Sequence, residues 1–154
     1  MQKKIFTFLI LLFLSSCSYE AIYSKKNSKN YNFFISELNF FGDRDINLRI
    51  KERLNNYTLN EKDKNFTLKI SSASTKVIAA KDRLGDAMTF KNTIVANIEV
   101  LMDGEFKNSF IIIESFIYNN NSNRFNLKKY EKEIKNNLAE TIAEKLIFKL
   151  SNIQ

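Results

Sequence analysis

Two long runs of alternating residues, joined by Asp103-Gly104, constrain the fold of this chain more than any other feature. In the run 88–102, the even positions from 94 to 100 are all apolar, and most of the odd positions between them are polar. The run 106–118 follows as the next strand candidate. An Asp-Gly pair between two such runs is a strong signal for a tight β-hairpin. We therefore expect two long antiparallel strands.

Two more strands are expected earlier in the chain. The segment 31–41 is dense in aromatic residues and isoleucine, and apolar residues alternate with Thr67 and Lys69 over 66–70. Both patterns are typical of strands, and the second continues weakly through 71–79. The charged segment 81–86, around Gly85, predicts a turn that leads into the run from position 88.

Apolar residues at helical spacing predict two amphipathic helices. We expect Asp43 or Asp45 to cap the first helix at its N-terminus, and Asn55-Asn56 to end it. The apolar positions are Ile46, Ile50, Leu54 and Tyr57 in the first helix, and Tyr130, Ile134, Leu138, Ile142, Leu146 and Leu150 in the second.

Local signals also predict how the second helix begins. Asn126 is expected as its N-cap, with Phe125 and Tyr130 placed to form a hydrophobic staple. Glu131 and Lys135 are spaced for an i,i+4 ion pair in the favourable orientation.

The expected element order is β-α-β-β-β-α. A β-α-β start implies parallel first and second strands joined by a right-handed crossover, and an antiparallel meander follows. Both helices need a cover, so we expect an α/β (α+β) two-layer sandwich in which two helices pack on one face of a four-stranded mixed sheet. One such domain over residues 31–154 suits the length of the chain.

For some apolar residues of the strands, the sequence raises the question of what covers them. Ile111-Ile-Ile113 indicates a well-covered position in the run 106–118. The aromatic residues of the first strand, including Phe33, Phe34 and Phe41, exceed what one buried face needs. They either pack on both sides of the sheet or form an apolar surface that a partner covers.

The N-terminus has the pattern of an export signal. Lys3-Lys4 precedes an apolar stretch over 5–14, which is too short to span a bilayer as a helix. The sequence Leu14-Ser-Ser-Cys17 resembles the bacterial lipobox, in which the cysteine is lipidated and the signal peptide is cut before it. We therefore expect a signal peptide over 1–16 and a lipidated Cys17 with a polar tether over 17–30; the alternative is a plain signal peptide followed by a chance cysteine.

The residue after the cysteine bears on the destination of the chain. Ser18 stands where an inner-membrane retention signal would usually have Asp. By resemblance to that sorting rule, we expect a lipid anchor on the periplasmic side of the outer membrane in a Gram-negative bacterium. Several acyl chains on one residue hold a protein stably at a membrane, whereas a single chain binds only marginally.

The residue inventory argues against an enzyme. The chain has no His, a single Cys and only 3 Gly, which excludes Ser-His-Asp, Cys-His and cysteine-cluster zinc chemistry. No Ser-x-x-Lys motif or phosphate-cradling glycine loop is present. We expect no catalytic residue, no metal and no cofactor. A net charge of +7 suggests nucleic acid, but the export signal and the lack of a dense basic stretch argue against it.

Three parts of the chain resemble the LptE family, the outer-membrane lipoprotein partners of the lipopolysaccharide transporter LptD. The likeness covers nearly all of the chain after the signal peptide, although Ser18 and Ala21 stand where the family usually has Gly and often Pro. The parts that carry the resemblance are Cys17-Ser-Tyr-Glu-Ala-Ile-Tyr23, the Arg83-Leu-Gly85 turn, and Ser115-Phe-Ile-Tyr-Asn119 followed by Asn126-Leu-Lys-Lys129 and a helix ending in Ala143-Glu-Lys-Leu-Ile-Phe-Lys-Leu150.

The resemblance implies a function and a set of site residues. An LptE-like domain would plug the LptD β-barrel, support assembly of the barrel and bind lipopolysaccharide on its way to the outer leaflet. The family's lipopolysaccharide contacts correspond here to Arg83, with Lys81 beside it, and to Lys128-Lys129. Arg binds phosphate bidentately and Lys supplies a point charge, so these residue types suit lipid A phosphates.

Two alternatives remain open. The four basic residues are also what an ordinary solvated surface would show in a lysine-rich chain. The chain could instead be an auxiliary periplasmic lipoprotein subunit of a lipid-trafficking ABC transport system, which would bind protein partners without engaging a barrel.

Overall fold

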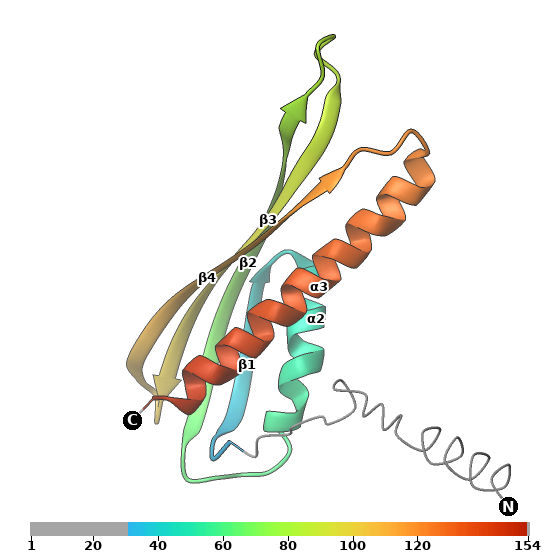
Figure 1. Cartoon of the computed structure of the whole chain (residues 1–154). Coiled ribbons are helices and arrows are strands. Elements are labelled where there is room, and N and C mark those ends of the chain that lie inside the picture. Colours follow the sequence, from blue (N-terminus) through green and yellow to red (C-terminus); the bar gives the residue numbers. More distant parts are fainter. Residues whose placement is uncertain (1–30, 154) are drawn as a thin grey trace, which may run out of the picture. The chain divides into compact units, whose positions relative to one another are not determined.

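The computed structural model describes residues 31–153, in which two helices lie on one face of a four-stranded sheet (Figure 1). This confirms the predicted two-layer fold and its element order. The signal peptide over 1–16, Cys17 and the tether over 17–30 lie outside the described residues. The elements are β1 Phe34–Gly42, α2 Arg44–Leu54, the 3-10 turn η1 Asn55–Tyr57, β2 Asn65–Lys81, β3 Ala87–Met102, β4 Glu105–Asn119 and α3 Arg124–Ser151.

The strands lie in the order β1-β2-β3-β4. β1 runs parallel to β2, with Ile35 opposite Phe66, and the next two pairings are antiparallel. Asp103 and Gly104 form the turn between β3 and β4 with φ values of 53° and 84°. Two successive positive φ angles fit the turn type that joins two-residue hairpins, and Asp-Gly tolerates them best.

The β2–β3 hairpin extends beyond its neighbours on both sides (Figure 1). Pairing with β1 ends where Gly42 faces Ser72, and pairing with β4 ends where Thr89 faces Asn119. β2 nevertheless continues to Lys81. The weak continuation over 71–79 is therefore a full strand, and the end of the hairpin is a two-stranded ribbon.

The core lies between the sheet and the helices. On β2 and β3, the even positions point toward the helices, and Phe66, Leu68, Ile94 and Ile98 are almost fully buried there. The i,i+4 series of α3 is buried as predicted at Ile134, Leu138, Ile142, Leu146 and Leu150, whereas its first member, Tyr130, is 45% exposed. Neither helix in the described range is long and apolar enough to cross a membrane.

Among residues 31–153, no helix lies on the other face of the sheet, and this bears on two sequence expectations. Ile111 and Ile113 are 69% and 59% exposed, and only Ile112 between them is buried. The expectation of a well-covered triplet is wrong because alternate residues of a strand face opposite sides. The aromatic residues near the first strand are also divided, since Phe33 is buried and Phe41 is 59% exposed, with a register shift in β1 between Ile35 and Glu37.

The helix starts were predicted with mixed success. Asp43 caps α2, since its Oδ1 accepts hydrogen bonds from the amides of Asp45 and Ile46 at 3.1 and 3.3 Å. The prediction of Asn126 as the cap of α3 is wrong, because Asn123 fills that role and the helix already begins at Arg124. Inside the helix, Phe125 is 76% exposed and forms no staple.

Candidate functional site

The turn between β2 and β3 is organised by the carboxylate of Asp82. Its Oδ1 accepts hydrogen bonds from the amides of Leu84 and Asp86, at 2.9 and 2.8 Å. The Asp82 amide donates to the carbonyl of Asp86 at 2.9 Å, which closes the turn. Gly85 has a φ of 91°, a conformation that glycine adopts at little cost. The turn therefore has a defined shape, and Arg83 and Leu84 lie at its tip.

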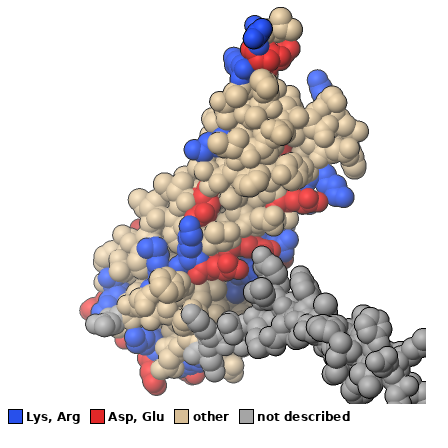
Figure 2. Space-filling model, viewed as in Figure 1, with Lys and Arg blue, Asp and Glu red and all other residues tan. Residues whose placement is uncertain are grey.

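Arg83 and Lys81 are both exposed at this end of the hairpin. Within residues 31–153, neither side chain takes part in a salt bridge or a side-chain hydrogen bond. The cations are therefore available to an external anion without first breaking an internal pair. Figure 2 shows basic and acidic atoms together at the end of the hairpin, so its charge is mixed.

Lys128 and Lys129 lie in the second turn of α3 and are also exposed. Asn123 Oδ1 caps this helix by accepting from the amides of Phe125 and Asn126, each at 3.1 Å. The first turn contains no acidic residue and carries Arg124 instead. Because the N-terminal end of a helix is itself partly positive, these cations oppose the helix dipole rather than complement it. Their combined field favours a nearby anion.

The two basic groups lie at the same end of the sheet, although they do not form one pocket. Asn120, just after β4, donates from its amide to Met88 O and from its Nδ2 to Ala87 O, both at 2.8 Å. These bonds fix the loop before α3 to the base of the hairpin. A cavity of about 360 Å³ adjoins this loop, and the residues that line it are Asn119, Asn120, Asn121, Asn126, Leu127 and Tyr130.

A polar cluster holds α3 against the hairpin and β4. Glu131 Oε1 accepts from Lys76 Nζ at 2.5 Å and from the Tyr118 hydroxyl at 2.9 Å. Lys76 Nζ also lies 3.9 Å from the centre of the Phe90 ring. Burial raises the pKa of Tyr118 well above its usual range, and the hydrogen bond to the Glu131 carboxylate raises it further. The start of α3 is thus fixed relative to the hairpin.

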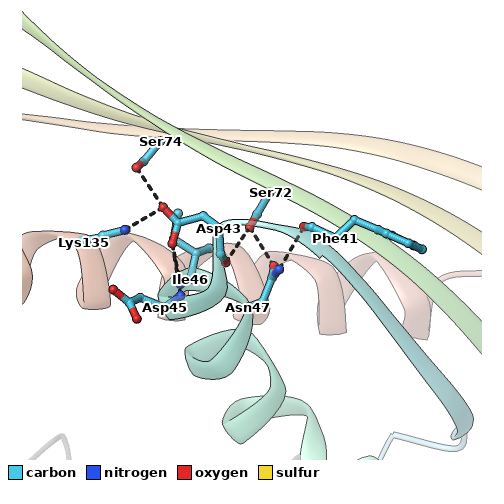
Figure 3. A network of polar contacts seen from close by, with 8 residues as sticks. All are labelled: Phe41, Asp43, Asp45, Ile46, Asn47, Ser72, Ser74 and Lys135. Atoms are coloured by element: carbon cyan, nitrogen blue, oxygen red, sulfur yellow. Dashed lines mark hydrogen bonds and ion pairs between the residues drawn. The ribbon is translucent and has the colours of Figure 1, made fainter.

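Asp43 joins three elements in a second cluster (Figure 3). Its Oδ2 lies 2.6 Å from Lys135 Nζ and accepts from Ser74 Oγ at 3.2 Å. Burial alone would raise the pKa of Asp43, but the bonds from Lys135, the Ile46 amide and Ser74 together lower it. Glu131 and Lys135 therefore each pair with another element, and the predicted bond between them is wrong.

The buried Asn47 continues this network behind Asp43. Asn47 Nδ2 donates to Phe41 O at 2.9 Å, and its Oδ1 accepts from Ser72 Oγ at 2.7 Å (Figure 3). Burying an amide is tolerated only when its hydrogen bonds are made, as they are here. The network fixes the crossover from β1 to α2, and hence the position of α2 on the sheet.

The structure adds two residues to the sequence-derived site. Leu84 is 89% exposed between Arg83 and Gly85, and Arg124 brings a further cation to the start of α3. The turn signal around Gly85 could have identified Leu84 as a tip residue. Arg124 was missed because the cap, and with it the start of the helix, was expected three residues later than it lies. Over residues 31–153, no group of three or more acidic, histidine or cysteine side chains could hold a metal ion.

Comparison with known proteins identifies solved structures with a similar fold. No family model matches the sequence, and no curated protein matches it. Among solved structures, rare lipoprotein B from Shewanella oneidensis matches 75% of this chain and 93% of its own, at 12% identity and a TM-score of 0.58. A minor lipoprotein from Acinetobacter baumannii matches 77% and 92%, at 9% identity and a TM-score of 0.57.

Lipoprotein B from Nitrosomonas europaea is similar to the same extent. The match covers 75% of this chain and 81% of that chain, with 11% identity and a TM-score of 0.57. Identities this low carry no information about individual site residues. The chain has the fold of these bacterial lipoproteins.

Proposed function

We propose that this chain is a lipoprotein anchored through Cys17 on the periplasmic side of the outer membrane, where it plugs an LptD-type β-barrel and assists its assembly. It binds lipopolysaccharide during transport to the outer leaflet and performs no catalysis. The observation that carries the proposal is a set of exposed cations, Arg83, Lys81 and Lys128-Lys129, with no salt-bridge partner among residues 31–153, at one end of a fold shared with bacterial lipoproteins.

Charge and residue type support lipopolysaccharide as the ligand. Lipid A presents phosphates, and a guanidinium at the tip of a hairpin can bind them without any rearrangement of the fold. The cations at the start of α3 add a second point of attraction at the same end of the sheet. An extended amphiphile with more than one phosphate could contact both groups.

The uncovered face of the sheet supports a protein partner. Ile111, Ile113 and Ile117 of β4 are each more than half exposed on that face. Exposed apolar patches on folded proteins often mark interfaces. A barrel that surrounds the domain would cover this face, whereas subunits of an ABC system would contact it without enclosing it.

A pull-down distinguishes the two partners. The lipidated chain is isolated from a detergent extract of its host, and the proteins that accompany it are identified by mass spectrometry. The proposal expects a large outer-membrane β-barrel in stoichiometric amount. Recovery of ABC-transporter subunits without a barrel would favour the alternative lipid-trafficking role.

Charge reversal tests the ligand. Arg83→Glu and the double change Lys128→Glu/Lys129→Glu are each expected to weaken lipopolysaccharide binding by roughly 10- to 100-fold, since a hydrogen bond to a charged group contributes about 1.5–3 kcal/mol. Acidic residues suit a helix N-terminus, so the double variant should fold normally.

Matched controls lie at the opposite end of the sheet. Lys107 in β4 and Lys51 in α2 are exposed, and Lys107→Glu and Lys51→Glu change the net charge by the same amount per residue. These controls should bind like the wild type. Equal losses in the controls and the site variants would mean that only the overall charge of the domain matters.

A further inference from the structure

Four large apolar side chains are exposed on the distal part of the β2–β3 hairpin. Val77 and Ile78 are 48% and 49% exposed, Met88 is 54% exposed, and Leu84 at the tip is 89% exposed. Below the charged tip, Figure 2 shows a surface with few charges. Val77 and Ile78 are neighbours in one strand and therefore face opposite sides of the hairpin, whereas Leu84 lies at the tip and Met88 just after it.

The fold does not need this apolar surface. Only residues 81–88, past the pairing of Ala80 with Thr89, have no strand beside them on either edge, because Thr89 still pairs with Asn119 of β4. A two-stranded ribbon is only marginally stable in water by itself. Apolar side chains on such a ribbon add the further free-energy cost of exposing apolar surface to water. Its position is set from below, by the ion pair of Lys76 with Glu131 and by the packing of Phe90 on Tyr118 at 5.9 Å.

The turn presents Leu84 with part of its backbone already satisfied. The amides of Leu84 and Asp86 both donate to Asp82 Oδ1. An unpaired backbone amide opposes transfer into an apolar medium, and these two amides are paired. Leu84 can therefore enter a hydrocarbon environment without leaving its own amide unbonded.

The charges around the ribbon indicate which apolar medium it meets. The segment 77–91 carries the cations Lys81, Arg83 and Lys91 and the carboxylates Asp82 and Asp86, a net charge of +1. Apolar side chains flanked by Lys and Arg are typical of elements that lie at a lipid interface, where the long basic side chains reach the head groups. The site is thus complementary to an anionic amphiphile.

We propose that Leu84, with Met88 of the same two-stranded ribbon, inserts among the acyl chains of lipopolysaccharide while Arg83 and Lys81 bind its phosphates. This inference rests on the proposed function, because it takes lipopolysaccharide as the ligand of the same end of the domain. It adds that the hairpin recognises the hydrocarbon part of the ligand as well as its charge.

The test compares two forms of the ligand. The mature chain in detergent is titrated with intact lipopolysaccharide and with the same material after alkaline removal of its acyl chains, which retains the phosphates. Leu84→Ser is measured beside Leu59→Ser, which alters an exposed leucine (73%) in the loop before β2. Thermal unfolding of both variants checks the fold, and neither side chain contributes to the core.

The expected result is that Leu84→Ser weakens binding of intact lipopolysaccharide roughly fivefold, because the leucine side chain would be partly buried among acyl chains in the complex. Binding of the deacylated form should be unchanged. Leu59→Ser should change neither. If Leu84→Ser binds intact lipopolysaccharide like the wild type, or loses affinity for both forms equally, the inference is wrong and the proposed function stands. If the wild type binds neither form, the proposed function fails and the inference fails with it.

Discussion

Lys135 of α3 contacts Asp43, the N-cap of α2, with 2.6 Å between Nζ and Oδ2. The same carboxylate accepts from the first turn of α2 and from Ser74 of β2. One side chain therefore joins both helices and the sheet. The contact sets where α3 crosses the sheet, and hence where Lys128, Lys129 and the cavity beside them lie relative to the hairpin.

Replacing Asp43 separates its two roles. Asparagine caps helices as well as aspartate does, so Asp43→Asn should lose mainly the ion pair, about 0.5–1 kcal/mol of unfolding free energy. Asp43→Ala should lose the cap as well, about 1 kcal/mol more. Urea unfolding at neutral pH measures both differences.

The pH dependence of stability tests the same carboxylate. The folded-state pKa of Asp43 lies below its ordinary value of 3.8, so its contribution is present above that pH and is lost as the pH falls through the folded value. The wild type should therefore lose more stability on acidification than Asp43→Asn does. Identical acid sensitivity in the two proteins would show that the Lys135 contact contributes nothing.

The hydrogen bond between Tyr118 and Glu131 should make the stability of the domain depend on alkaline pH. Tyr118→Phe removes the hydroxyl that donates to Glu131 and should reduce stability by about 1 kcal/mol. The raised folded-state pKa of Tyr118 means that its contribution is present below about pH 10 and is lost as the pH rises through the folded value. Alkaline unfolding should be less steep in the variant.

Absorbance titration of tyrosine gives a second measurement. In Glu131→Gln, the pKa of Tyr118 should fall toward its ordinary value, because the carboxylate that disfavours the tyrosinate is gone. Tyr130→Phe is the control, since within residues 31–153 its hydroxyl makes no hydrogen bond. An unchanged titration in Glu131→Gln would rule out the carboxylate as a cause of the shift.

Gly42 and Gly85 should differ sharply on replacement by alanine. Both have positive φ, 87° and 91°, but a Cβ on Gly42 would lie 2.0 Å from the backbone oxygen of Ser72. That oxygen accepts a hydrogen bond from the Asp43 amide at 2.9 Å, so it cannot easily move. Gly42→Ala should reduce stability by roughly 3 kcal/mol or more.

Gly85→Ala supplies the comparison because no atom lies within 4 Å of its added Cβ. It should reduce stability by about 1 kcal/mol, the conformational part alone. Chemical denaturation of the two variants gives the difference. Equal effects would mean that the close approach of β1 to Ser72 is not maintained in solution.

Adjacent residues of β4 test which face of the sheet is covered. Ile112 is 4% exposed and faces the helices, so Ile112→Ala should reduce stability by roughly 2–4 kcal/mol. Ile113 is 59% exposed on the other face, and Ile113→Ala should change the stability of the isolated domain by less than about 1 kcal/mol. A large effect at Ile113 would mean that the domain alone buries this face, for example by self-association.

Several elements followed from local pattern alone. The alternation over 88–102, the Asp103-Gly104 turn and the i,i+4 series in α3 depend on residues close in sequence, and all three were predicted. The basic site residues also lie where their segments suggested, on the hairpin and on the second turn of α3. Whether they bind lipopolysaccharide stays a prediction.

Other features failed because the deciding contact is distant. Glu131 and Lys135 have the spacing of a helical ion pair. Instead, Glu131 contacts a tyrosine and a lysine of the sheet, and Lys135 contacts the N-cap residue of α2. Ile111-Ile-Ile113 looked equally apolar at every position, and nothing local indicates which face receives the helices. Asn123 is the N-cap of α3, and Asn126 is not, although both have the same side chain.

The sequence by itself determined the succession of strands and helices, because periodicity and turn chemistry act over a few residues. Only the tertiary structure decided which residues of β4 face the helices, that the hairpin extends beyond β1 and β4, and that Leu84 is exposed between paired backbone amides. Those outcomes depend on the relative lengths of neighbouring strands and on charges that meet across the fold. The candidate site depends on both sequence and tertiary structure: the sequence supplies its basic and apolar residues, and the packing determines which of them are exposed.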